Sequence, residues 1–115
     1  MPEQNHTFFS EVMTEVSIPE KGILSRTIQN DQWSKIVLFA FAPGEELSEH
    51  TSSMPAVLYF LQGEAELTLG ADRLKAGPSS LAHMPPKLPH AIRAKTALVM
   101  LLVLIKVPEP SATVT

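Results

Sequence analysis

The sequence contains no cysteine and is poor in glycine and aromatic residues. Its 115 residues include five Gly and one Trp, and aromatic residues make up 6% of the chain. Without cysteine there can be no disulfide, iron–sulfur cluster, thiolate metal site or cysteine nucleophile. Because the glycines are isolated and no serine lies in a GxSxG motif, the chain offers neither a phosphate-binding loop nor a nucleophile elbow.

Strong positive charge and long apolar runs are missing as well. The nine Lys and Arg residues are scattered and the net charge is −3, which disfavours nucleic acid as a partner. The most apolar run, residues 97–105, is about half as long as a membrane-spanning helix. The polar segment MPEQNHTFF has no basic stretch leading into an apolar one and is not typical of a secretory signal. We therefore expect a cytoplasmic protein without a membrane partner.

What is present is the composition of one small globular domain rich in strand signals. Hydrophobic residues make up 44% and charged residues 18%, while ten Pro and five Gly interrupt the chain at short intervals. The β-rich runs show no alternation with helices, so we expect an all-β fold, an antiparallel sandwich or barrel. The expected strands are residues 23–29, 35–42, 57–62, 64–69, 81–84, 90–94 and 97–107.

The positions of the β-rich runs divide the chain into three parts. We interpret residues 21–107 as the barrel and residues 1–20 as a segment that packs on the barrel or on a dimer partner. Residues 108–115, PEPSATVT, are typical of a frayed tail.

Two of the expected strands are apolar on both faces. They are KIVLFAF, residues 35–41, and ALVMLLVLI, residues 97–105. A strand with one wet face should alternate, so the outer faces of these strands must also be covered. Either a second copy of the chain covers them, which predicts a homodimer, or the N-terminal segment folds over them.

The stretch PGEELSEHTSSMPAVLYFLQGEAEL, residues 43–67, carries the first candidate site residue, His50. The acidic run that precedes it favours a solvated loop. If residues 51–61 form one strand, alternation places a mixed polar and apolar set on one face, as in a ligand pocket. The set comprises His50, Ser52, Met54, Ala56, Leu58 and Phe60.

Two further histidines flank a proline-rich turn. His83 precedes and His90 follows Pro85, Pro86 and Pro89. Prolines restrict the backbone, so the hairpin should be stiff and should hold His90 in a reproducible place, as a metal ligand requires. Alternation does not decide whether His83 points inward, and a histidine in an apolar strand is often structural.

These segments in this order resemble the small single-domain cupins of the RmlC-like jelly-roll superfamily. The resemblance rests on the Gly44 to His50 spacing, the strand ending in LYFLQGEAEL, the turn at Gly77 and the PPKLPHAI segment. It covers most of the chain and implies a double-stranded β-helix, that is, a small jelly-roll barrel, usually dimeric and cytoplasmic. It also implies a divalent metal, Mn, Fe, Ni or Zn, held inside the barrel by three histidines and a glutamate.

The resemblance is incomplete at the metal ligands. His50 and His90 match the first-motif and second-motif histidines, whereas Ser52 and Ala56 stand at the places of the second histidine and the glutamate. Lys87 stands where the second motif usually has glycine, and Ala94 where it often has asparagine. Two imidazoles make a weaker site than three protein ligands, and His83 would complete such a set if it faced inward.

Two functions remain open from the sequence. In the first, His50 and His90, with or without His83, hold a divalent metal and the protein is an enzyme such as an oxygenase or isomerase. In the second, the barrel is a metal-free module or sensor that binds a small apolar or carbohydrate-like molecule without catalysis. The expected pocket residues are Ser52, Met54, Leu58, Phe60 and Ile92.

Overall fold

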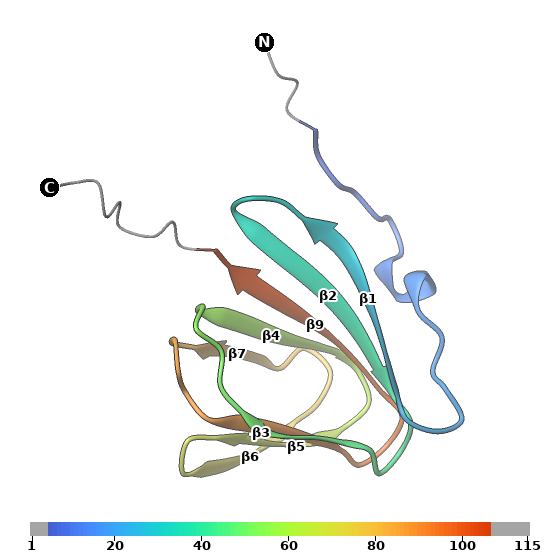
Figure 1. Ribbon diagram of the computed structural model, residues 1–115. Helices are drawn as coiled ribbons and strands as arrows, with labels where there is room; N and C mark the ends of the chain where they lie inside the picture. Colours follow the sequence, from blue (N-terminus) through green and yellow to red (C-terminus); the bar gives the residue numbers. More distant parts are fainter. Residues whose placement is uncertain (1–4, 107–115) are drawn as a thin grey trace, which may run out of the picture.

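The computed structural model describes residues 5–106, which fold as two antiparallel β-sheets and one turn of 3-10 helix (Figure 1). The short helix is η1 (Val12–Glu15), and no α-helix occurs among the described residues. The strands are β1 (Ile23–Asn30), β2 (Ser34–Phe41), β3 (Glu46–His50), β4 (Ala56–Gln62), β5 (Ala65–Leu69), β6 (Asp72–Ala76), β7 (Leu81–Met84), β8 (His90–Ala94) and β9 (Leu98–Ile105).

The strands are ordered β1-β2-β9-β4-β7 in the larger sheet and β3-β8-β5-β6 in the smaller one. All pairings are antiparallel, and most neighbours in a sheet are distant in sequence, as β2 with β9 and β3 with β8. The two sheets face each other as the walls of a barrel (Figure 1). This confirms the expectation of an all-β double-stranded β-helix, the cupin jelly roll.

The main hydrophobic core lies between the sheets. On β4, Ala56, Leu58 and Phe60 alternate inward and are at most 1% exposed, and Ile92 of β8 faces them from the smaller sheet. Alternation of this kind is what a strand with one buried face requires. The core therefore fixes which side chains can reach the barrel interior.

A second cluster covers part of the outer face of the larger sheet. Leu38, Ala40 and Val99 are buried there, and Val12 and Val16 of the N-terminal segment pack against them. An ion pair between Arg26 and Glu15, 3.3 Å from nitrogen to oxygen, also links this segment to the sheet. The segment thus accounts for part of the apolar outer face of β2 and β9. Residues 1–4 and the expected tail lie outside the described residues.

Two strands were not expected from the sequence. Residues 46–50, expected as a solvated loop, form β3, and residues 72–76, DRLKA, form β6. Both are rich in charged side chains because each is the edge strand of the smaller sheet and has a wet outer face. The condition that residues 51–61 form one strand is not met, because residues 51–55 cross from the smaller sheet to the larger one.

Two turns depend on the residue type at one position. Asp31, in the β1–β2 turn, accepts hydrogen bonds from the backbone N–H groups of Trp33 (2.8 Å) and Ser34 (2.9 Å), which hold the pKa of its carboxyl below the usual value. Gly63, between β4 and β5, has φ +86°, and a Cβ there would lie 1.9 Å from the carbonyl oxygen of Ala97. Only glycine fits this close approach of two chain segments.

Candidate functional site

The strands β3 and β8 bring His50 and His90 directly opposite each other. The register between these strands shifts after the pair Leu47 and Ile92, so that two residues of β3 face one residue of β8. This β-bulge reverses the alternation along β3, and His50 therefore shares the inner face with Leu47. Without the extra residue, the imidazole of His50 would point away from the barrel.

The two imidazole rings are neighbours. Their centroids are 4.2 Å apart and their planes are inclined by 58°. Nδ1 of His50 lies 2.8 Å from the carbonyl oxygen of Ser48, and Nδ1 of His90 lies 2.9 Å from that of Leu88. Because a carbonyl oxygen can only accept, both Nδ1 atoms carry a proton, and in the neutral form of each ring the lone pair is therefore on Nε2.

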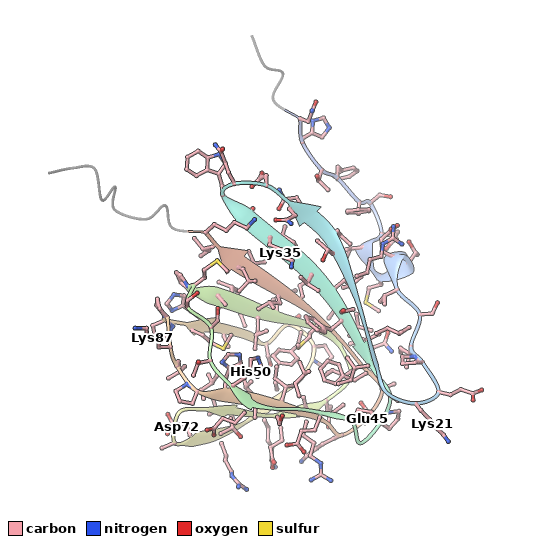
Figure 2. The ribbon with its side chains drawn as sticks, viewed as in Figure 1. Lys21, Lys35, Glu45, His50, Asp72 and Lys87 are labelled. Atoms are coloured by element: carbon pink, nitrogen blue, oxygen red, sulfur yellow. The ribbon has the colours of Figure 1, made fainter. Side chains whose placement is uncertain are left out.

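The pair lies where the interior meets solvent. Figure 2 shows His50 between the two sheets; its side chain is exposed, whereas His90 is 6% exposed. No buried side-chain nitrogen or oxygen in residues 5–106 lacks a hydrogen-bond partner. Nε2 of His90, which bonds to no described protein group, therefore borders space that water or a ligand can reach. Both rings combine a fixed orientation with an open nitrogen, which is the requirement for a ligand-binding imidazole.

The turn before His90 is held by backbone contacts. Lys87 has φ +68°, in the left-handed region that favours glycine, and its N–H donates to the carbonyl oxygen of Ser52 at 2.7 Å. The N–H of Gly70 donates to the carbonyl oxygen of Pro89 at 2.8 Å. The turn is thereby tied to the β3–β4 crossing on one side and to the β5–β6 turn on the other.

The structure does not bring His83 to this pair. On β7, Ala82 and Met84 pack in the core, so His83 points to the outer face, opposite Val57 of β4. The alternation that the sequence left undecided is settled by the pairing of β7 with β4. His83 would need a different strand register to reach His50.

The expected pocket residues divide into two groups. Leu58, Phe60 and Ile92 are part of the buried core, at most 2% exposed. Ser52 and Met54 lie on the crossing between β3 and β4, where the Ser52 hydroxyl accepts a hydrogen bond from the Met54 N–H at 3.1 Å. The sequence therefore named interior residues, but the pair of histidines and the crossing loop, not one strand face, form the polar part of the site.

The donor set does not fit a four-ligand metal centre. No group of three His, Cys, Asp or Glu side chains within residues 5–106 is placed to hold a metal ion. Ala56 is buried on the inner face of β4 and offers no donor atom, and the Ser52 hydroxyl already accepts a hydrogen bond. A divalent cation at this position would have only the two Nε2 atoms of His50 and His90 as protein ligands.

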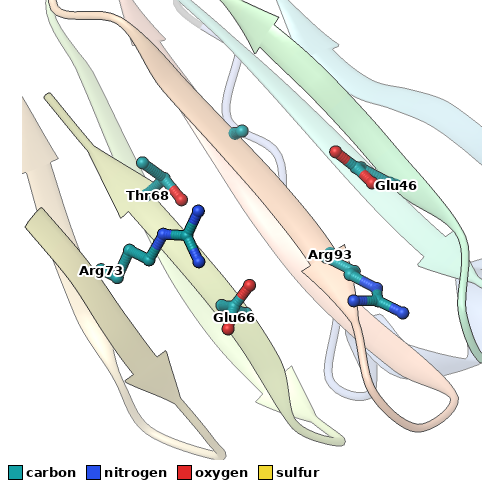
Figure 3. Close-up of a pocket in the computed structure, with 6 residues that line it drawn as sticks. Glu46, Glu66, Thr68, Arg73 and Arg93 are labelled. Atoms are coloured by element: carbon teal, nitrogen blue, oxygen red, sulfur yellow. The ribbon is translucent and has the colours of Figure 1, made fainter. Parts of the chain in front are cut away.

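The outer face of the smaller sheet carries a separate polar hollow of 280 Å³ (Figure 3). Glu46, Glu66, Arg73 and Arg93 surround it, with Arg93 lying opposite both Glu46 and Glu66 on the neighbouring strands. Because these residues alternate with inward-facing ones, the hollow is on the far side of the sheet from the histidine pair. Its opposite charges on neighbouring strands are typical of a solvated sheet face.

Comparison with known proteins decides the family. A sequence model described as the cupin domain matches residues 37–105. The chain belongs to the cupin domain family. This cupin is 32% identical to a conserved protein of unknown function from Streptococcus pyogenes, with a TM-score of 0.80 over 90% of this chain and 91% of that one. It is 26% identical to a cupin superfamily protein from Desulfitobacterium hafniense, with a TM-score of 0.79 over 91% and 94%.

A more distant likeness concerns the fold alone. KdgF from a Halomonas species is 18% identical, with a TM-score of 0.74 over 92% of this chain and 98% of that one. A search of curated proteins finds no match.

Among the described residues there is no helix of the length and hydrophobicity needed to cross a membrane. The cytoplasmic location stays a prediction.

Some features of the site had no readable signal in the sequence. The bulge that turns His50 inward involves Ser48 and Glu49, which are ordinary edge-strand residues. Leu69, directly opposite His90 on β5, is also a site neighbour that sequence reasoning did not name. Its proximity follows from the pairing of two strands that are far apart in the chain, which alternation within one strand cannot reveal.

Proposed function

We propose that this cupin binds a small molecule inside the barrel and that the paired imidazoles of His50 and His90 are its polar contact. The observation that supports this is the common orientation of the rings. Each Nδ1–H is engaged by a main-chain carbonyl, and each Nε2 is left to accept a hydrogen bond or to bind a metal. The main-chain bonds at Nδ1 account for the orientation of the rings but leave both Nε2 atoms without a described protein partner.

A divalent metal is the first candidate for what the pair holds. The two Nε2 atoms would be its protein ligands, and the remaining positions would be taken by water and by the bound molecule. When bound, such a metal would supply Lewis-acid polarisation of a ligand oxygen. The resemblance to metal-binding cupins supports this candidate, with oxygenase or isomerase chemistry as the corresponding enzyme prediction.

Metal analysis of tag-free protein tests this candidate. The protein is incubated separately with Mn, Fe, Ni and Zn salts, passed over a desalting column and assayed for bound metal. We expect metal in the wild type and its loss in His50→Ala and His90→Ala, while His83→Ala, a matched histidine on the outer face, keeps it. Metal retained equally by all four proteins would place the binding elsewhere.

The second candidate is a metal-free binding module, and the missing third ligand favours it. With Ala56 buried and Ser52 engaged, the site offers the two imidazoles among apolar groups. An uncharged ligand that donates a hydrogen bond to Nε2 suits this interior without any metal. If none of the four metals binds, this candidate replaces the first.

We also propose that the protein is a homodimer through the outer face of the larger sheet. The N-terminal segment covers the part of this face around Leu38 and Val99. Farther along, Val57 and Val103 lie opposite each other on β4 and β9 and are only half-buried. A second copy would bury these apolar side chains, which supports the expected self-association.

A further inference from the structure

The barrel is open along one side, where the edge strands of the two sheets approach each other. β6 is the last strand of the smaller sheet and β7 the last strand of the larger one, and they are consecutive in the chain. A cavity of 370 Å³ lies between them. We call it the edge groove; its apolar lining includes Phe60, Leu67, Leu69, Leu74, Leu81 and Ala82.

The edge groove has a buried floor and an exposed rim. Phe60 and Leu67 at the floor are 0% and 3% exposed, whereas Leu74 at the rim is 44% exposed. Leu81 borders the rim, but its alternation with Ala82 turns its side chain to the outer face of the larger sheet, as for His83. Leu74 lies directly opposite Leu67 and therefore faces the interior, although it belongs to the edge strand. An exposed leucine that faces a concave apolar surface is a feature of ligand or partner sites.

The edge groove offers nothing to pair with a charged ligand. Its hydroxyl, on Ser80, accepts a hydrogen bond from the Gly77 N–H at 2.9 Å. Lys75 borders the groove but lies opposite Glu66, on the face of β6 that points away from the core. A charged group placed among these leucines would lose its hydration without a partner. The part of a ligand that enters here is therefore uncharged and apolar.

One lining residue of the edge groove is a neighbour of the histidine pair. Leu69, one of its lining residues, lies directly opposite His90, so the two side chains are neighbours on the same face of the sheet. The row His50, His90, Leu69 thus runs from the polar site to the apolar groove across β3, β8 and β5.

We infer that the edge groove between β6 and β7 holds the apolar part of a small amphiphilic ligand, an uncharged aryl or branched alkyl group, whose polar end contacts His90. This inference rests on the proposed function only for the polar end. The groove itself can be tested with a molecule that has no polar end, and so the two can fail separately.

Toluene and 4-methylphenol are suitable probes, because they differ only by one hydroxyl. In methyl-labelled protein followed by NMR, toluene is expected to shift the methyl resonances of Leu69, Leu74 and Ala82. Leu74→Lys should weaken toluene binding about tenfold, since it removes an apolar wall and adds a charge to the rim. Leu24→Lys is the control, because Leu24 is similarly exposed, at 48%, and faces outward on β1.

His90→Ala separates the groove from the histidine pair. It should leave toluene binding within about twofold and should remove the additional affinity of 4-methylphenol, which comes from the hydroxyl bonded to Nε2. Toluene that causes no shift at the groove methyls, or binds Leu74→Lys as tightly as wild type, overturns the site. An equal affinity of both probes for wild type overturns the link to His90, whatever the metal analysis gives.

The mass of Leu74→Lys by light scattering completes the test. We expect the same mass as for wild type, because the groove is a ligand site and not a subunit contact. A fall from dimer to monomer would show that a second copy covers the groove and would overturn the inference.

Discussion

Introducing a carboxylate at position 56 tests the geometry of the site most directly. Ala56 is 1% exposed on the inner face of β4, beside Met84 and Leu104 of the neighbouring strands. It also stands where the metal-binding cupins have their glutamate. We predict that Ala56→Glu is strongly destabilised without metal and is partly rescued by a divalent metal, because the new carboxylate then has a cationic partner beside His50 and His90.

The size of both effects can be worked out. A buried carboxylate without a partner costs about 3–5 kcal/mol. At about 4 °C per kcal/mol for a domain of this size, the melting temperature of the metal-free variant should fall by about 12–20 °C. Metal at about 100 times its Kd returns about 2.7 kcal/mol, or about 10 °C.

Thermal unfolding of chelator-treated, tag-free protein with and without added Mn or Zn measures this. Ala56→Gln is the matched control, because it has nearly the same volume but a neutral amide that binds metals poorly. The metal-induced rise in melting temperature should be much larger for the Glu variant than for the Gln variant. Equal rises would refute the reasoning, since they would mean that the side chain at position 56 does not reach the cation.

Three other predictions concern the fold and the assembly. Gly63→Ala should destabilise the protein by about 3 kcal/mol or more in urea unfolding, because its Cβ meets the carbonyl oxygen of Ala97 at 1.9 Å; an unchanged midpoint would contradict the close approach. Because the pKa of Asp31 is lowered by its two backbone donors, its stabilisation is present above the unfolded-state pKa and is lost as pH falls through the native pKa. Asp31→Ala should therefore be less stable than wild type at neutral pH and lose less stability on acidification, and parallel pH profiles would count against this. Val57→Lys should convert the expected dimer to a folded monomer in light scattering, and a dimer that survives would place the interface elsewhere.

Much of the barrel could be predicted because its strands obey local rules. The alternating residues of β4 and the closely spaced Pro and Gly residues identify strands and turns locally, and seven of the nine strands within residues 5–106 could be found from such patterns. The strands β3 and β6 were not predicted, because edge strands with a wet face carry charged residues, which are typical of loops as well. Local composition cannot distinguish the two.

Part of the site could likewise be predicted from the sequence, and part could not. His50 and His90 could be named from the sequence, because the Gly44 spacing and the proline-rich turn mark them, and the missing donors at Ser52 and Ala56 were readable too. That His50 faces inward depends on a bulge in its pairing with β8, 40 residues farther along the chain. The tertiary structure alone decided this orientation, the outward direction of His83 and the edge groove. Each of these results from register between strands distant in sequence, and register is set by packing of the whole core, whereas alternation and turns are set by neighbouring residues.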